Sequence, residues 1–377
     1  MLAFATVGLR AEPPVILNDS AKFLGATSCA SSGCHGGGGQ NQNQFHVWSL
    51  KDFHSQRPFA TLTTARSKQI SDALQIKDPA ADNRCTSCHA PLASVPDAQR
   101  GATFKLSEGV SCESCHGPAE NWLRAHTRTD WTHADRTFAG MRDLKNIYVR
   151  ANNCVACHQT VEAPLLKAGH PELIFELDGQ SVAQPKHWRD GTNASGAQAW
   201  LVGQAVALRE LSWQIGREQS VDDNLKNRWL ALYWLMKKVR PVFGLAETES
   251  VPVAGATIQN AQWVQNWSDA DAKYYAGLIW SDDFTRKALS MLAGCSESFR
   301  DASAPPSLQA RRAERLVLAL DRLLGRVNPP PPATANAKLN DLFRRAQSIP
   351  DFDPAAFATA LDEFAKAVSR GHDGSPQ

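Results

Sequence analysis

The sequence predicts a mainly α-helical protein with an irregular N-terminal part built from short helices and a C-terminal helical bundle. Two observations support this fold class. From about residue 195 onward, apolar residues recur at spacings of three and four. Before residue 160 the chain is rich in Gly, Pro, Asn and Ser, lacks long periodic runs, and contains eight of its nine cysteines. The expected organisation is a leader over residues 1–24, a domain over 25–194 and a helical domain over 195–377.

The N-terminal stretch MLAFATVGLRAEPP begins with a short apolar run. A small residue, Ala11, follows this run and precedes Glu12 and two prolines, which indicates the tail of a secretion signal peptide. A disordered cytosolic leader is the alternative. No later run approaches the roughly 18 apolar residues needed to span a bilayer, so no transmembrane segment is expected. The formal charge of +2 and the absence of a basic stripe argue against a nucleic-acid partner.

Eight cysteines form four pairs, and a histidine directly follows each pair. The motifs are Cys29/Cys34/His35, Cys85/Cys88/His89, Cys112/Cys115/His116 and Cys154/Cys157/His158. The last three have the form C-x-x-C-H, which is typical of covalent c-type haem attachment. In this motif two thiols bond to the haem vinyl groups, and the adjacent imidazole binds the iron from the same face. These four histidines are therefore the candidate proximal ligands of four covalently bound haem c groups.

A zinc site and a disulfide framework are the alternatives to haem. Two C-x-x-C pairs can share a tetrahedral zinc ion, but zinc does not need a histidine directly after each pair. A disulfide framework does not need one at all. The first pair, CASSGCH, has a four-residue spacer and is interpreted as haem-binding because the other three motifs accompany it. Since thioether attachment takes place outside the cytoplasm, a periplasmic or otherwise extracytoplasmic location is expected.

The second axial position of each iron needs its own ligand, and seven further histidines are available. Histidines on both sides keep the iron low-spin and suit electron transfer, whereas an open position permits small-molecule binding. The strongest distal candidates are His54, His126 and His170. Three others compete for a fourth position, namely His46, His133 and His187. His372 lies in a polar tail and is expected to be a surface residue.

The C-terminal half has helical periodicity but no ligand motif. The periodic runs cover residues 197–215, 224–239, 307–327 and 353–370. Pro241 ends the second run, while Asp353 and Pro354 are an N-cap and a first-turn proline for the last one. Residues 328–333, NPPPPA, form a stiff linker. We expect this half to cover the first domain, dock a partner or dimerise. The unpaired Cys295 is interpreted as a buried apolar residue, with an intermolecular disulfide as the alternative.

Several segments together carry a resemblance to a known family. They are SCASSGCHGG, DFHSQ, CTSCHA, GVSCESCHGPAENWLRAHT, CVACH and AGHPELIFEL followed by PKHW. Over roughly residues 25–190 the chain resembles multihaem cytochromes related to the tetrahaem cytochrome c554/c-prime family. Larger relatives carry further attachment sites towards the C-terminus, whereas this sequence has no fifth C-x-x-C-H motif.

The resemblance implies a pairing of ligands. In the family's tetrahaem core, three haems have two histidine ligands and one can be five-coordinate. Taken in order along the chain, His126 would serve the haem of His35, His170 that of His116, and His54 that of His158. The haem of His89 would then be the candidate open site, unless His46 or His187 fills it.

The leading functional hypothesis is a periplasmic electron carrier that passes electrons between redox partner proteins through closely packed haems. The alternative from the enzyme class is a haem enzyme acting on a small nitrogen or sulfur compound at the haem of His89. A third hypothesis is a subunit of a larger redox complex or cytochrome filament, with the helical half as the assembly element or the contact between like subunits.

Overall fold

The computed structural model describes residues 20–39, 42–189, 195–217, 221–246, 251, 257–328, 330, 332–347 and 351–370. These residues divide into two compact units, called here the cysteine-rich unit (20–189) and the helical unit (195–370). As predicted, the described part of the chain is mainly helical and contains no strand, with short helices in the first unit and longer, packed helices in the second.

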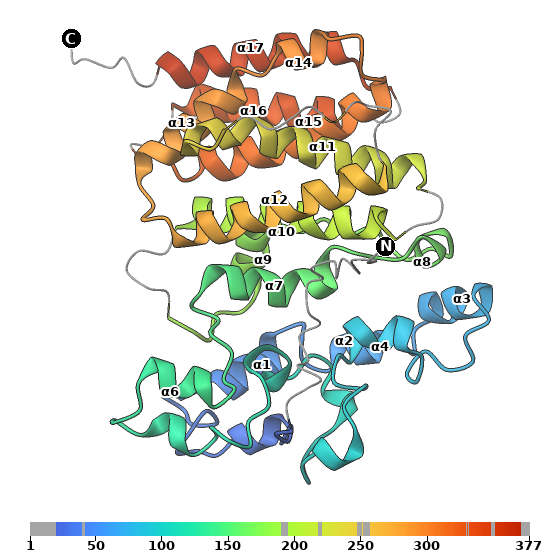
Figure 1. Cartoon of the computed structure of the whole chain (residues 1–377), viewed down its shortest axis with the longest axis vertical. Coiled ribbons are helices and arrows are strands. Elements are labelled where there is room, and N and C mark those ends of the chain that lie inside the picture. Colours follow the sequence, from blue (N-terminus) through green and yellow to red (C-terminus); the bar gives the residue numbers. More distant parts are fainter. Residues whose placement is uncertain are drawn as a thin grey trace, which may run out of the picture. The chain divides into compact units, whose positions relative to one another are not determined.

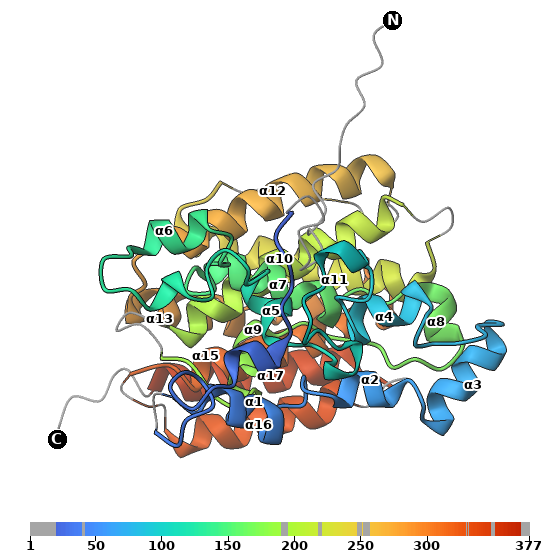
Figure 2. The ribbon, with the colours of Figure 1, turned by 90° about the horizontal axis from the view of Figure 1, so that it is seen from below.

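The cysteine-rich unit consists of short helices joined by irregular loops (Figure 1). Its α-helices are α1 (Gln44–Lys51), α2 (Arg57–Thr61), α3 (Ala65–Ala73), α4 (Asn83–His89), α5 (Cys112–His116), α6 (His133–Phe138), α7 (Ile147–His158), α8 (Ala163–Lys167) and α9 (Leu177–Ala183). Short 3-10 turns are η1 (Ala26–Cys29), η2 (Asp97–Gln99), η3 (Leu106–Glu108) and η4 (Ala125–Thr127). Helices α2 and α4 lie side by side in both views of the ribbon (Figures 1 and 2).

Apolar packing in this unit is confined to small clusters. Phe23 packs with Leu92 and Val95, and a second cluster contains Val161 and Leu165. Phe23 belongs to the segment assigned to the leader from the sequence. In the structure its side chain is buried and its backbone exchanges hydrogen bonds with residues 99 and 101. Residues 1–19 lie outside the described part of the chain.

The helical unit contains α10 (Gly196–Ile215), α11 (Asp223–Val239), η5 (Arg240–Phe243), α12 (Ile258–Gly277), α13 (Asp282–Ala293), α14 (Glu297–Arg300), α15 (Pro306–Leu324), α16 (Ala333–Ala346) and α17 (Pro354–Arg370). Helix α10 packs along α12, α11 packs against α15, and α16 packs against α17 (Figure 1). No helix in the described residues is long and apolar enough to cross a membrane.

All four helices predicted in this half are present, as α10, α11, α15 and α17. The carboxylate of Asp353 accepts hydrogen bonds from the backbone N–H groups of residues 355 and 356, so the predicted N-cap is confirmed. Cys295 is buried, as predicted, and its thiol donates to the carbonyl of Met291 at 3.3 Å. Residues 329 and 331 of the proline-rich linker lie outside the described part of the chain.

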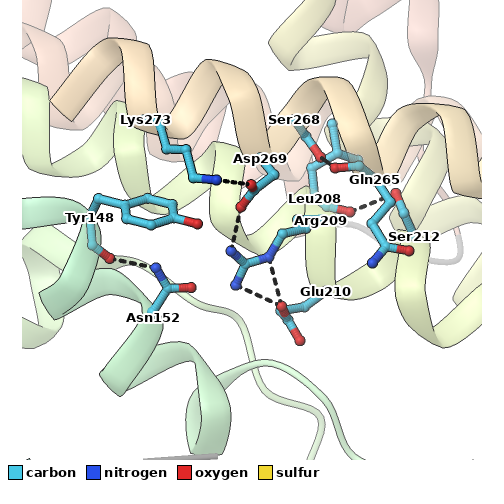
Figure 3. A network of polar contacts seen from close by, with 10 residues as sticks. All are labelled: Tyr148, Asn152, Leu208, Arg209, Glu210, Ser212, Gln265, Ser268, Asp269 and Lys273. Carbon is cyan, nitrogen blue, oxygen red and sulfur yellow. Dashed lines mark hydrogen bonds and ion pairs between the residues drawn. The ribbon is translucent and has the colours of Figure 1, made fainter. Parts of the chain in front are cut away.

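Helix α12 was not predicted from the sequence because its buried face is partly polar. Alongside Val264 and Ala272 it buries the charged residues Asp269 and Asp271, so its apolar residues do not follow a helical period over its whole length. Asp269 is compensated by Arg209 of α10 at 2.7 Å and by Lys273 at 2.8 Å. Arg209 also binds Glu210 at 2.8 Å, which completes a buried charge network between α10 and α12 (Figure 3).

Candidate functional site

Three of the four cysteine motifs lie at the C-terminal ends of capped helices. Helix α4 is capped by Asp82, whose carboxylate accepts from the N–H of Arg84, and α7 is capped by Asn146. At the start of helix α5 the hydroxyl of Ser114 accepts the backbone N–H of Ser111 at 3.1 Å, and the carbonyl of Ser111 accepts the N–H of Ser114 at 3.0 Å. These caps start each helix at a fixed residue, so the two cysteines and the histidine share one helical turn.

The first motif reaches a comparable arrangement through a turn. Its cysteines flank residues 30–33, and the N–H of His35 donates to the carbonyl of Cys29 at 3.2 Å. A Cβ on Gly36 would lie 1.8 Å from the carbonyl oxygen of Ala30, so only glycine fits directly after the histidine. The longer spacer is therefore accommodated as a closed loop that returns His35 to the first cysteine.

Cys34 is the most exposed of the eight cysteines in the four motifs. Cys29 is buried and the six cysteines of the other motifs are half-buried. Cys34 is exposed because the four-residue spacer carries it to the outer side of the loop. Residues 31–33 are exposed as well, and the N–H of Cys34 donates to the carbonyl of Ser31 at 2.9 Å, which closes a turn there. Attachment at Cys34, as at the other seven cysteines, stays a prediction.

Six candidate ligand histidines form three facing pairs. The ring centres are 6.1 Å apart for His35 and His126, 6.0 Å for His54 and His158, and 6.5 Å for His89 and His170. A metal–imidazole bond is about 2 Å long, so two imidazoles on opposite sides of one ion have ring centres about 6 Å apart. Each pair therefore fits one haem iron, with the proximal histidine supplied by the cysteine motif.

Hydrogen bonds fix the ring orientation in these pairs. The Nδ1 atom of His35 binds the amide oxygen of Gln44 at 2.9 Å, and that of His89 binds the carbonyl of Pro58 at 2.8 Å. Backbone carbonyls also bind Nδ1 of His126 and His170, at 3.1 and 2.9 Å. Because Nδ1–H is the donor in each bond, Nε2 is the unprotonated nitrogen, which is the one available to a metal.

His54 differs from the others because its Nδ1 partner is a carboxylate. Asp52 Oδ1 lies 3.0 Å from Nδ1 of His54, and Asp52 Oδ2 accepts from the side-chain amide of Gln184 at 2.9 Å. Burial raises the pKa of this carboxyl, but the hydrogen bonds from His54 and Gln184 outweigh it and leave the pKa below its ordinary value. Asp52 is therefore held as a carboxylate.

The three weaker distal candidates differ in which nitrogen the protein uses. Nε2 of His46 binds the carbonyl of Gly36 at 2.9 Å, and Nε2 of His133 binds Asp143 at 3.1 Å. In His187 it is Nδ1 that faces an acceptor, the carbonyl of Pro185 at 3.2 Å. Among these three, His187 has the nitrogen pattern found in the facing pairs.

In the structure the ring of His170 lies beside that of His89, with ring centres 6.5 Å apart. The resemblance implies instead that His170 serves the haem of His116 and that the haem of His89 has the open position. Within the described residues, His116 has no facing imidazole of the kind the other three proximal histidines have. His170 directly follows Gly169, whose positive φ of +103° is a conformation that favours glycine.

Burial favours the neutral form of three proximal imidazoles, those of His89, His116 and His158, and this is the form in which histidine binds metals. It lowers the pKa of His116 to about 4 and that of His158 to about 4, and it also lowers the pKa of His89. Positively charged neighbours, with His187 and Arg142 first among them, also oppose protonation of His116.

The cysteine motifs approach one another in two pairs. A hydrogen bond between the thiols of Cys29 and Cys112 lowers the pKa of Cys29 and raises that of Cys112. A bond between Cys88 and Cys157 has the same effect, lowering the pKa of Cys88 to about 7 and raising that of Cys157. The first motif therefore lies against the third and the second against the fourth.

A buried glutamate connects the first and third motifs. Glu113, within CESCH, is fully buried, and its carboxylate accepts backbone N–H groups from Leu24 at 2.8 Å, Gly25 at 2.7 Å and Ala119 at 2.8 Å. Burial raises its pKa, while these three bonds oppose the rise. The carboxylate thus holds the segment that leads into the first motif on the helix that carries the third.

Arg142 caps the other end of α5. Its guanidinium donates to the carbonyls of Ser114 and Cys115 at 2.9 and 2.8 Å and to the side chain of Asn153 in α7 at 2.7 Å. These carbonyls have no partner within the helix, so Arg142 fixes α5 relative to α7. Asp52, Glu113 and Arg142 were not identified from the sequence; only the position of Asp52 in DFH, two residues before a candidate ligand, was a signal.

Comparison with known proteins gives a match to one family model. Residues 28–117 match the family model for cytochrome c554 and c-prime. The match spans the first three cysteine motifs and implies c-type haem binding, in proteins that are usually extracytoplasmic. No curated protein and no solved structure matches the chain. No cluster of three or more His, Cys, Asp or Glu side chains suited to a bare metal ion is present in the described ranges.

Proposed function

We propose that this protein is a tetrahaem electron carrier that exchanges electrons with redox partner proteins in the periplasm. The observation that carries the proposal is the set of three facing imidazole pairs, each joined to a cysteine motif, with ring centres 6.0–6.5 Å apart. When bound, each haem supplies a one-electron couple, and two histidine ligands let iron change valence with little rearrangement.

The fourth iron belongs to the third motif, and we propose His187 as its distal ligand. Its Nδ1 faces a carbonyl, as in His126 and His170, which leaves Nε2 for a metal, and it is among the side chains that influence His116 electrostatically. With every axial position filled, the haems would serve electron transfer rather than catalysis on a small molecule.

The residues of the chain set the distances between haems. Motif one lies against motif three, and motif two against motif four, through the sulfur contacts Cys29–Cys112 and Cys88–Cys157. The haems would accordingly lie in two close pairs, which favours rapid transfer within each pair. Glu113 and Arg142 maintain the contact between the attachment segments, and the helical unit is available for docking or assembly.

Intact-mass measurement of protein exported to the periplasm tests this proposal. The expected result is a mass increase of four haem groups, with a pyridine haemochrome spectrum typical of two thioether bonds per haem. A single-motif control, Cys85→Ser with Cys88→Ser, should lose one haem and keep three. Fewer than three haems in the parent protein, or zinc in the cysteine motifs, would overturn the proposal.

A further inference from the structure

The carboxylate of Asp52 is positioned to act on one haem ligand only. Its side chain is 1% exposed and follows α1 directly. Oδ1 accepts both the backbone N–H and Nδ1–H of His54 at 3.0 Å, while Gln184, at the end of α9, donates to Oδ2 at 2.9 Å. The two oxygens are thus both occupied, and the carboxylate cannot rotate away from the imidazole.

In the His35–His126 and His89–His170 pairs, the groups that accept the Nδ1–H hydrogen bonds are neutral. Nδ1 of His35 faces the amide of Gln44, and Nδ1 of His89 faces the carbonyl of Pro58 and the hydroxyl of Thr61. His126 and His170 face backbone carbonyls. The His54–His158 pair is therefore distinguished from the His35–His126 and His89–His170 pairs by a buried negative charge on a ligand.

A carboxylate bound to Nδ1–H makes the opposite nitrogen of an imidazole a stronger electron donor to a metal. A stronger donor stabilises ferric iron relative to ferrous iron, because the ferric ion carries the greater positive charge. Hydrogen bonding to axial ligands is one of the means by which a protein sets the potential of a haem. We propose that Asp52 is a positioning residue that lowers the reduction potential of the haem held between His54 and His158.

This inference rests on the proposed haem ligation. It identifies the fourth-motif haem as the one whose potential the protein sets through a charged hydrogen bond. Because Asp52 hydrogen-bonds to His54 and to no other candidate ligand among the described residues, we expect its effect to be largest on this haem.

A redox titration followed by electron paramagnetic resonance tests the proposal on the haem-loaded protein. His54→Ala first identifies the low-spin signal of the His54–His158 iron as the one that disappears. Asp52→Asn, which keeps the shape but removes the charge, should raise the midpoint potential of that signal. Asp52→Ser, which replaces the carboxylate by a neutral hydroxyl, should shift the midpoint potential of the same signal in the same direction.

Gln44→Glu is the matched opposite change, because it gives His35 a charged acceptor. It should lower the midpoint potential of the His35–His126 iron and leave that of the His54–His158 iron unchanged. Haem content is measured in every variant. A parent protein that does not contain the haems would contradict the proposed function. Four haems together with an unchanged midpoint potential of the His54–His158 iron in both Asp52 variants would overturn this inference alone.

Discussion

The imidazole of His170 faces that of His89 with ring centres 6.5 Å apart, although 81 residues separate them in the sequence. The backbone around His170 is held by Arg66, whose guanidinium donates to the carbonyl of Gly169 at 2.8 Å. Since α4 supplies His89 and the 169–170 turn supplies His170, the second cysteine motif has two imidazoles placed as a pair of candidate axial ligands.

His170→Ala should convert one low-spin iron of the oxidised protein to high-spin, because the iron opposite His89 loses its second imidazole. Electron paramagnetic resonance measures the change directly. His46→Ala is the matched control and should leave the spectrum unaltered, since Nε2 of His46 binds the carbonyl of Gly36. An unchanged spectrum in His170→Ala would remove this residue from the ligand set.

His187→Ala addresses the third motif. With His187 as the ligand opposite His116, the parent protein has four low-spin irons and does not bind cyanide readily. The substitution should open one iron to cyanide or nitric oxide, detected as a shift of the Soret band. A parent protein that already shows one high-spin, cyanide-binding iron would contradict the assignment and favour the enzyme hypothesis.

Glu113→Ala should destabilise the cysteine-rich unit by at least about 3 kcal/mol, because it leaves three backbone N–H groups without their acceptor in a buried site. Glu120→Ala is the matched control. Glu120 also accepts a backbone N–H, from Lys22 at 2.8 Å, but at an exposed position, and should cost about 0.5 kcal/mol. Thermal unfolding followed by haem absorbance compares them; equal losses would show that Glu113 has no special role.

The sequence identifies candidate attachment residues because covalent haem chemistry requires a local pattern: two thiols and an imidazole within one turn. It predicted α10 and α15 because their buried faces are apolar. The exposure of Cys34 could not be foreseen, since it depends on how the four-residue spacer folds. The axial pairs could not be assigned from the pattern either, because His89 and His170 meet through loop geometry that depends on contacts far along the chain.

Arg209→Met tests the charge network in the helical unit. Arg209 is 2% exposed and compensates both Glu210 and Asp269. Removing it leaves buried carboxylates without their main partner, a change that typically costs about 3–5 kcal/mol. Lys273→Met removes the half-exposed partner of Asp269 and should cost less than about 1 kcal/mol. Calorimetry of the haem-loaded protein measures both; equal effects would contradict a buried network centred on Arg209.

Asp271 gives the helical unit a defined pH dependence. Burial raises the pKa of Asp271 to about 6, although Arg240 and the hydroxyl of Tyr275 oppose the rise. The ordinary pKa of 3.8 applies to the unfolded chain. Between about pH 4 and pH 6 the folded state therefore holds a proton that the unfolded state has lost, so this residue's contribution to stability falls as the pH rises.

Asp271→Asn removes this titratable group, so that Arg240 lies beside the same neutral side chain at every pH. A shift of about two pKa units corresponds to about 3 kcal/mol, so the variant should gain about that much stability relative to the parent protein between pH 4 and pH 7. Denaturant unfolding at both pH values measures the difference. Because any fixed cost of the substitution is the same at both values, a difference that does not change with pH would show that the carboxyl of Asp271 titrates normally in the folded protein.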